Sequence, residues 1–267
     1  MLPFYIYYSI FGFQRVGDLI WAAADSRARG FLLGGTAGRT TLSGEGLQHQ
    51  DGTSHLAAST IPNCRAWDPC FGYELATIVE DGARRMLEAQ EDVFYYLTVS
   101  NENYAHPALP AGAKEGILRG MYLLEARAGA KLQLLGSGPI LREALAAAQV
   151  LEREHGVKAN VWSVTSWSEL RWDGLASAGA SAAIREIRTE TSKAWITQCL
   201  EGTKGPIVAA SDYVSAVADL PRAWAPQGRR YVALGTDGFG RSDTRVALRN
   251  FFGVDRDAIV AAALKAL

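Results

Sequence analysis

The residues with the clearest chemical potential lie in one polar, glycine-dense run, residues 34–55 (GGTAGRTTLSGEGLQHQDGTSH). The run contains six of the chain's 27 glycines and two of its four histidines, together with Arg39 and Glu45. Glycine lets the backbone approach a ligand closely, while His, Glu and Arg side chains supply proton transfer and contacts to anions. Because a polar run this long inside a compact domain is typically functional or disordered, and apolar segments flank it on both sides, we predict a binding loop.

Within this loop, His49 is our candidate for acid–base or substrate-contacting chemistry. Metal binding is the alternative, since Glu45 precedes His49 by four residues and His55 follows it by six. No HxH or HxxxH pair and no nearby cysteine complete a zinc-type ligand set, however. We expect His55 to brace the loop and His155, near a helix end, to be solvated, while His106 is open to either a structural or a functional role.

An aromatic cluster near the N-terminus is the second candidate. Tyr5 and Tyr7 are expected to pack in the core of a buried strand over residues 3–8. Tyr8 and Phe11 fall where that strand ends, at the carboxyl edge where open α/β sheets place ligands, so they could line an apolar cofactor pocket.

Gly136 and Gly138 follow an apolar segment and precede a helical pattern, which resembles half of a nucleotide-binding turn. The third glycine is missing, and two glycines at a helix N-terminus occur in many βαβ units. Tight packing of strand against helix is therefore preferred over phosphate binding.

These candidates must be positioned by alternating strands and helices. Apolar runs and helical periodicity predict strands at 3–8, 31–33, 61–67 and 93–99, with helices at about 14–28 and from Asp68-Pro69 to about 87. Asp68 is expected to be an N-cap residue, followed by proline at the first helical position. Alternation of this kind points to a parallel sheet covered by helices.

A segment rich in proline, glycine and asparagine, residues 101–112, is typical of a domain boundary, so we expect domains at 1–112 and 113–267. In the second domain we predict strands at 131–135, 160–164, 206–210 and 230–234, and helices at 141–151 and about 212–224. Asp255 is expected to cap a final helix. Residues 165–205 show no readable pattern.

The amino-acid composition limits the classes of function that the chain can have. With 48% hydrophobic residues, 21% charged residues and a net charge of −1, the chain resembles a soluble protein without a basic surface for nucleic acid. Three cysteines without CxxC spacing favour a reduced, cytoplasmic setting. The apolar N-terminus lacks signal-peptide features and is too short to cross a bilayer. Because a domain rarely begins inside its own core, we expect a fragment or a split-gene product.

Five segments, taken in order, resemble one family: PFYIYYSIFGFQRVGDLIWAA, GGTAGRTTLSGEGLQHQDGTSH, NENYAHPALPAG, LLGSGPILREA and LGTDGFGRSDTRVALRNFF. They are similar to the homodimeric pyruvate dehydrogenase component of the bacterial pyruvate dehydrogenase complex, a thiamine-diphosphate enzyme of the transketolase superfamily. The resemblance is weakest at 165–205. It implies an α/β fold in which a truncated pyrimidine-binding domain is followed by a transketolase C-terminal-like domain.

By that resemblance, Tyr8 and Phe11 would contact the cofactor rings and His49 would be the active-site histidine. Glu45 and Arg39 would not contact the substrate themselves but would set the shape of the loop that carries His49. The family more often has an acidic residue where Gln50 stands. The family's magnesium and diphosphate motif and its activating glutamate do not occur in this sequence, so this chain should not hold or activate thiamine diphosphate and magnesium alone.

The resemblance implies oxidative decarboxylation of pyruvate with acetyl transfer to the lipoyl group of the dihydrolipoyl acetyltransferase core. It also implies self-association as in a homodimer, a cytoplasmic location, and no membrane or nucleic-acid partner. Two alternatives stay open, a non-catalytic assembly or partner-binding module and one subunit of a split thiamine-diphosphate enzyme.

Overall fold

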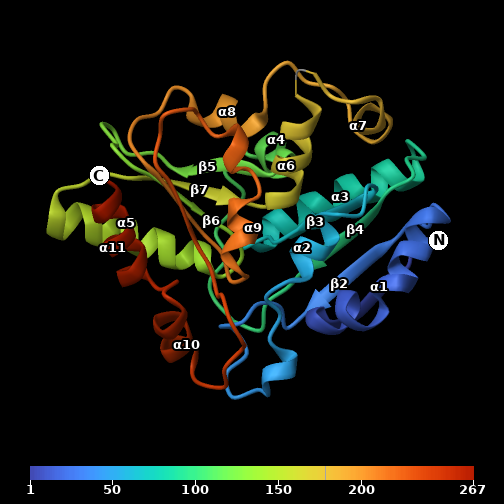
Figure 1. Ribbon diagram of the computed structural model, residues 1–267, viewed down its shortest axis with the longest axis horizontal. Helices are drawn as coiled ribbons and strands as arrows, with labels where there is room; N and C mark the ends of the chain where they lie inside the picture. The colour runs from blue at the N-terminus through green and yellow to red at the C-terminus, as the bar shows by residue number, and fades with distance from the viewer. Residues whose placement is uncertain (178) are drawn as a thin grey trace.

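The computed structural model describes residues 1–177 and 179–267 and contains two sheets that lie beside each other along the long axis of the molecule (Figure 1). The first sheet has the strand order β1-β2-β4-β3, and all its pairings are parallel. Its strands are β1 (Phe4–Tyr8), β2 (Phe31–Gly35), β3 (Cys64–Trp67) and β4 (Phe94–Thr98).

Helices cover both faces of this sheet, as parallel strands require. Apolar side chains of α1 (Ser9–Asp25) and α2 (Ser54–Ala58) pack on one face, around Tyr96. Those of α3 (Gly72–Leu87) and α4 (Lys114–Arg119) pack on the other face, around Tyr95.

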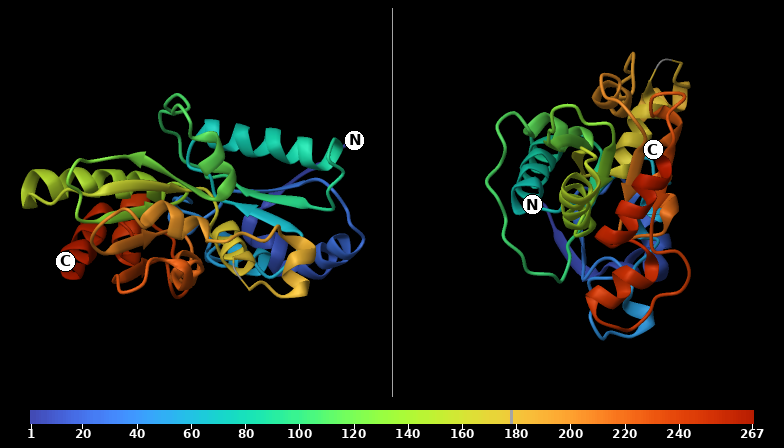
Figure 2. Two further views of the ribbon diagram at one scale, coloured as in Figure 1. Left: turned by 90° about the horizontal axis from the view of Figure 1, so that it is seen from above. Right: turned by 90° about the vertical axis from the view of Figure 1, so that its left-hand side faces the viewer.

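The second sheet has the order β5-β7-β6-β8-β9, with β5 antiparallel to β7 and the other pairs parallel. Its strands are β5 (Met121–Glu125), β6 (Gln133–Gly136), β7 (Asn160–Val164), β8 (Ile207–Ala210) and β9 (Tyr231–Leu234). One face packs on α5 (Ile140–His155) and α11 (Arg256–Ala266), and the other on α6 (Trp167–Ala176), α8 (Trp195–Leu200) and α9 (Ser215–Asp219). The views in Figure 2 show these layers.

Four short elements complete the described chain: η1 (Leu47–His49), α7 (Ala182–Ile187), η2 (Arg222–Trp224) and α10 (Arg245–Phe252). The predicted α/β fold class is confirmed, and the strand at 160–164 and the Asp255 cap are found as expected. The boundary at residue 112 stays a prediction. One sequence-based expectation is corrected here, because the helix predicted over 212–224 is two short turns separated at Pro221, before which a helix is disfavoured.

Asp68 is a second correction, since it does not cap a helix. The helix begins at Gly72, with Phe71 at the N-cap position. The Asp68 carboxylate is buried and accepts hydrogen bonds from Thr98 Oγ1 at 2.7 Å and Ser137 Oγ at 2.7 Å. Asp68 therefore joins the two sheets instead of starting a local helix.

Strand β1 is the third correction, because it is an edge strand and mostly exposed instead of buried. Phe4, Tyr5, Ile6 and Tyr8 are all exposed, Ile6 by 69%. Of the two tyrosines expected in the core, Tyr7 alone packs inward, with its ring 6.4 Å from that of Tyr96.

A free strand edge with an apolar face is a template for pairing with another chain. We therefore expect the isolated chain to self-associate, and Ile6→Lys to reduce this association, because lysine on an edge strand opposes pairing. Sedimentation velocity of both proteins checks the prediction, with Leu264→Lys on α11 as the control for an added surface charge. A monodisperse wild-type monomer would contradict it.

None of the helices in the described ranges is both long and apolar enough to cross a membrane.

Candidate active site

The carboxyl edge of the first sheet brings the strand end at Tyr8 and the polar loop together. Strands β1 and β2 are parallel, with Tyr8 opposite Gly35, so the loop that follows β2 begins beside the end of β1. After Tyr8 the chain turns directly into α1, which places Phe11 in the first turn of that helix. The loop then folds back so that His49, in η1, lies against both aromatic rings.

Three rings form the centre of the candidate site. The His49 imidazole stacks on Tyr8 with centroids 5.2 Å apart and planes inclined by 20°. It meets Phe11 edge to face at 5.3 Å, and the Tyr8 and Phe11 rings lie 5.8 Å apart. All three sequence-predicted residues are therefore neighbours in space, although 41 positions separate Tyr8 from His49.

Glu45 fixes the orientation of the imidazole. Its Oε2 lies 3.0 Å from His49 Nδ1, and both side chains are partly exposed. Since an ionised carboxylate only accepts hydrogen bonds, Nδ1 carries the proton in this pair and Nε2 is left for a bound molecule. A partly exposed pair of this kind adds at most about 1 kcal/mol to stability, so its main effect is orientation.

Arg39 lies in the polar loop and ties it to the segment that follows β9. Its guanidinium donates to the carbonyl oxygens of Thr236 and Gly238, the latter at 2.5 Å. Among the described residues Arg39 makes no hydrogen bond to His49, so the structure brings it to the loop's base and not to the three rings. Gln50 makes a similar link, because its side chain exchanges hydrogen bonds with the backbone of Arg241.

Arg15 belongs to this cluster and was missed from the sequence. Its guanidinium carbon lies 3.9 Å from the centre of the Phe11 ring, a cation–π contact. The spacing of four residues along one helix was the available signal, since residues at i and i+4 share a face. Arg15 places a positive charge beside the aromatic wall.

His55 has the bracing role expected for it. It is buried, and its Nε2 lies 3.0 Å from Thr98 Oγ1. Burial lowers the pKa of His55 to about 4, so its ring stays neutral near pH 7. Of the other histidines, His155 is exposed as predicted, and His106 Nδ1 accepts a hydrogen bond from Gly72 N at 2.9 Å.

The turn at Gly136 and Gly138 is packed against protein. A Cβ on Gly136 would come within 2.8 Å of Leu141 Cα, and one on Gly138 within 2.7 Å of the Asp68 carboxylate. Ser137 Oγ and Gly138 N both donate to Asp68. Because an acidic side chain already occupies the helix N-terminus, where a phosphate would bind, packing explains the two glycines.

The metal alternative finds no support in residues 1–177 and 179–267, where no group of three His, Cys, Asp or Glu side chains is arranged to hold an ion. The three cysteines are free, and Cys64 and Cys70 are buried. Burial raises the pKa of both buried thiols, which keeps them unreactive.

Asp212 anchors the polar loop and makes stability depend on pH. Its carboxylate accepts from Thr40 N at 3.1 Å, and burial raises its pKa to about 7, against the lowering effect of the Thr40 hydrogen bonds. The folded state thus keeps a proton that the unfolded state loses near pH 4. The stability that this proton provides is complete below pH 4 and is lost as the pH rises through 7.

The parent protein should lose up to about 4 kcal/mol of unfolding free energy between pH 4 and pH 7, at about 1.4 kcal/mol per pKa unit. We expect Asp212→Asn not to show this loss. His55 acts in the opposite sense, because its lowered pKa costs stability as the pH falls below about 6.5. Urea unfolding across this range, in the Ile6→Lys background, compares Asp212→Asn with its parent. Asp219→Asn, at a half-exposed position, is the control. Parallel pH curves for Asp212→Asn and its parent would contradict the prediction.

Both halves of the chain match families of known proteins. Residues 1–107 match the family profile "Pyruvate dehydrogenase E1 component middle domain", and residues 120–255 match "Transketolase-like TK C-terminal domain". The chain is 58% identical to the pyruvate dehydrogenase E1 component of Pseudomonas aeruginosa over 270 residues and 52% identical to that of Escherichia coli over 267 residues. These alignments cover 100% and 99% of this chain but only 30% of each relative.

Solved structures agree on the fold. A transketolase from Leishmania mexicana superposes with a TM-score of 0.74 at 18% identity, covering 100% of this chain and 34% of that one. A chain described as "Split gene transketolase, inactive beta4 tetramer" superposes with a TM-score of 0.71, also at 18% identity, and covers 100% of this chain and 76% of that one.

Proposed function

The chain belongs to the transketolase-like family, with its first part in the pyruvate dehydrogenase E1 branch, and from this membership we propose that it supplies one wall of a pyruvate dehydrogenase active site. The single observation that carries the proposal is the packing of His49 against Tyr8 and Phe11 at the carboxyl edge of the first sheet. The chain spans about 30% of the length of its relatives, so the activity requires residues that these relatives have beyond the matched region.

The residues present fit one part of thiamine diphosphate better than the other. The exposed aromatic face of Tyr8, with Phe11 beside it, suits the flat aromatic rings of the cofactor. The diphosphate and its magnesium need oxygen ligands, which we assign to residues outside this chain. When bound, thiamine diphosphate supplies the electron sink that decarboxylation of a 2-oxo acid requires.

In this proposal the chain's own residues have separate tasks. Tyr8 and Phe11 exclude water from one side of the reacting centre, which strengthens electrostatic interactions there. His49 donates or accepts a proton at Nε2, and Glu45 holds its Nδ1. Arg39 fixes the loop that carries both, through its bonds to Thr236 and Gly238.

The same proposal includes pyruvate as the substrate, acetyl transfer to a lipoyl group of a dihydrolipoyl acetyltransferase core, and assembly as a homodimer. The E1 relatives at 50–58% identity support these parts of it. A cytoplasmic location belongs to it too, supported by three free cysteines.

Calorimetric titration with thiamine diphosphate and Mg²⁺ tests the proposal in two proteins. One is this chain alone, and the other is a chimera in which the chain replaces the matching 30% of the Pseudomonas aeruginosa relative. We expect saturable binding to the chimera and none to the chain alone. A folded chimera that binds no cofactor would refute the proposal, and tight binding to the chain alone would refute the assignment of the diphosphate site to residues outside it.

The second candidate is a partner-dependent subunit or assembly module without chemistry of its own. The exposed apolar face and free edge of β1 favour it, because they fit a second polypeptide that adds a strand. A chimera that binds cofactor and assembles but turns over no pyruvate would favour this alternative.

A further inference from the structure

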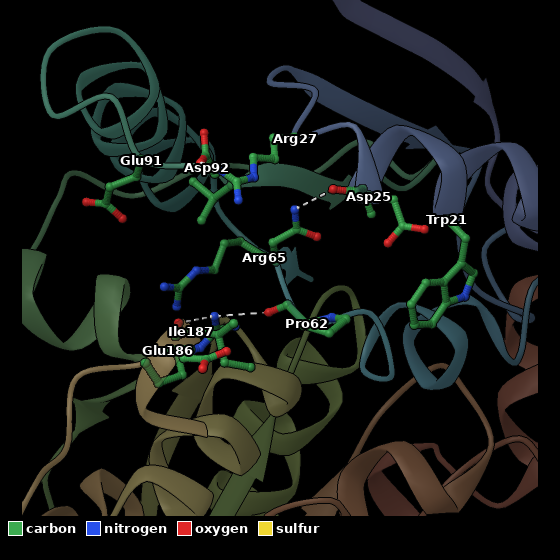
Figure 3. Close-up of a pocket in the computed structure, with 13 residues that line it drawn as sticks. Trp21, Asp25, Arg27, Pro62, Arg65, Glu91, Asp92, Glu186 and Ile187 are labelled. Atoms are coloured by element: carbon green, nitrogen blue, oxygen red, sulfur yellow. Dashed lines mark hydrogen bonds and ion pairs between the residues drawn. The ribbon is translucent and has the colours of Figure 1, made fainter. Parts of the chain in front are cut away.

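A cavity lies at the amino ends of the strands of the first sheet, the end opposite to the His49 cluster. Figure 3 shows the residues that line it. Its volume is about 580 Å³. Three of its walls are the segments that lead into β2, β3 and β4, and the fourth is residues 186–188 at the end of α7. The His49 site is built from the carboxyl ends of these strands, whereas this cavity is built from their amino ends.

Two guanidiniums on the floor of the cavity share one carboxylate, while the lining as a whole also includes the carboxylates of Asp25, Glu91, Asp92 and Glu186. Arg65 and Arg188 share a single carboxylate, that of Glu169, which accepts from Arg65 Nη1 through Oε2 and from Arg188 Nη2 at 3.2 Å through Oε1. All three side chains are at least nine-tenths buried. The other lining carboxylates with ion-pair partners are Glu91, which pairs with Arg85, and Asp92, which pairs with Arg27 and Arg29, so Arg65 and Arg188 have only the Glu169 carboxylate between them.

Hydrogen bonding on the floor is also incomplete. The Nε atoms of Arg65 and Arg188 are buried without a partner in the described part of the chain. Of the terminal nitrogens, Arg188 Nη1 donates to the carbonyl oxygen of Pro62 at 3.2 Å. Within the described part of the chain Arg65 Nη2 also makes no hydrogen bond, and an acceptor in the cavity would satisfy it. Arg65 reaches into the middle of the cavity (Figure 3), where such an acceptor would sit.

The buried charges on the floor shift one another's pKa values. Burial alone would raise the pKa of Glu169, yet the guanidiniums of Arg65 and Arg188 hold it below its usual value. Burial, together with repulsion by Arg65 and Arg85, lowers the pKa of Arg188 to about 10. An added anion would relieve this repulsion.

The walls and the rim of the cavity limit which other chemical groups a ligand can have. Trp21, Val93 and Ile187 provide apolar surface above the floor. The exposed carboxylates of Asp25 and Glu186 stand at the rim, where they would repel a second negative group. The ligand that fits is therefore small, with one oxyanion end and an uncharged or apolar body.

We propose that this cavity binds a small organic acid, whose single carboxylate or phosphate group is held by Arg65 and Arg188 while its body lies against Trp21. Guanidinium groups are well suited to this task, because their planar donor pairs match both carboxylate and phosphate oxygens. The site is separate from the proposed active site, and it does not depend on the proposed function.

Fluorescence titration of the full 267-residue chain tests the proposal, because Trp21 lines the cavity. The probes are L-lactate for the carboxylate group, glycerol 3-phosphate for the phosphate ester and inorganic phosphate for the bare oxyanion. We expect a saturable signal that disappears in Trp21→Phe, and Arg65→Gln should weaken binding about tenfold or more. The probe that binds most tightly identifies the anionic group that the cavity prefers.

Glu186→Gln provides a second test that does not disturb the buried floor. Removing this rim charge should strengthen anion binding by about two- to fivefold. Glu190→Gln, four residues away and outside the cavity lining, is the matched control and should change nothing. Absence of saturable binding in all three arms, or equal affinities for wild type, Arg65→Gln and Glu186→Gln, would overturn the proposal and leave Arg65, Glu169 and Arg188 as a structural ion cluster only.

Discussion

His49→Ala, introduced into the chimera with the Pseudomonas aeruginosa relative, is expected to lower pyruvate turnover by a factor on the order of 100. The reason is the loss of the proton-transferring nitrogen that Glu45 orients through its bond to Nδ1. Tyr8 and Phe11 would remain as an apolar wall, so cofactor affinity should change much less than turnover. Steady-state kinetics and the calorimetric titration measure the two quantities separately.

His155→Ala is the matched control, because this histidine is exposed at the end of α5 and touches no part of the candidate site. It should leave turnover unchanged. Near-normal turnover in His49→Ala would contradict the role assigned to His49. A fall in turnover that tracks an equal fall in cofactor binding would instead make His49 a packing residue for the rings.

Glu74→Ala is expected to lower the unfolding free energy by about 3–5 kcal/mol, the largest stability effect that we predict. Glu74 is fully buried in α3 and receives four hydrogen bonds. Its Oε1 accepts from Tyr122 Oη at 2.7 Å and Ser163 Oγ at 2.6 Å, both in the second sheet, while Oε2 accepts from the backbone of Cys70 and Phe71. Truncation leaves these buried donors without an acceptor between α3 and the second sheet.

Urea unfolding of the Ile6→Lys chain with and without Glu74→Ala measures this effect. Glu80→Ala serves as control, because Glu80 lies on the same helix with an exposed side chain that pairs only loosely with Lys114, at 3.4 Å. The control should cost less than about 1 kcal/mol. Equal free energies of unfolding for the Glu74→Ala and Glu80→Ala proteins would show that Glu74 does not tie α3 to the second sheet.

The sequence could predict elements whose signals are local. The run of apolar residues at 160–164 forms the strand as expected, and Asp255 caps the last helix through Ala258 N. The grouping of Tyr8 with His49 was also predictable, because parallel strands end at one edge and residues after them meet there.

Long-range contacts account for most of what sequence reasoning missed. Asp68 before proline has the local signature of an N-cap, yet its carboxylate is used by Thr98, Ser137 and Tyr213, which no local pattern can indicate. Glu74 and Asp212 escaped notice for the same reason. The burial expected for β1 depends on neighbouring strands, and within the described chain β1 has a neighbour on one side only.

Residues 165–205 were unreadable for a different physical reason. Helix α6 buries residues on all sides, among them Trp167, Leu170 and Trp172, together with the polar residues Ser168 and Glu169. A helix buried all round has no apolar stripe, so periodicity cannot reveal it. Strand β5 was missed as well, because its antiparallel pairing with β7 follows no βαβ pattern.

The most direct test of the central claim is turnover of pyruvate by the chimera, followed as acetyl transfer to the lipoyl group of a dihydrolipoyl acetyltransferase. The account predicts activity within about tenfold of the parent relative, because the chain supplies the complete His49, Tyr8 and Phe11 wall. A chimera that folds and binds thiamine diphosphate with magnesium but transfers no acetyl group would contradict the claim.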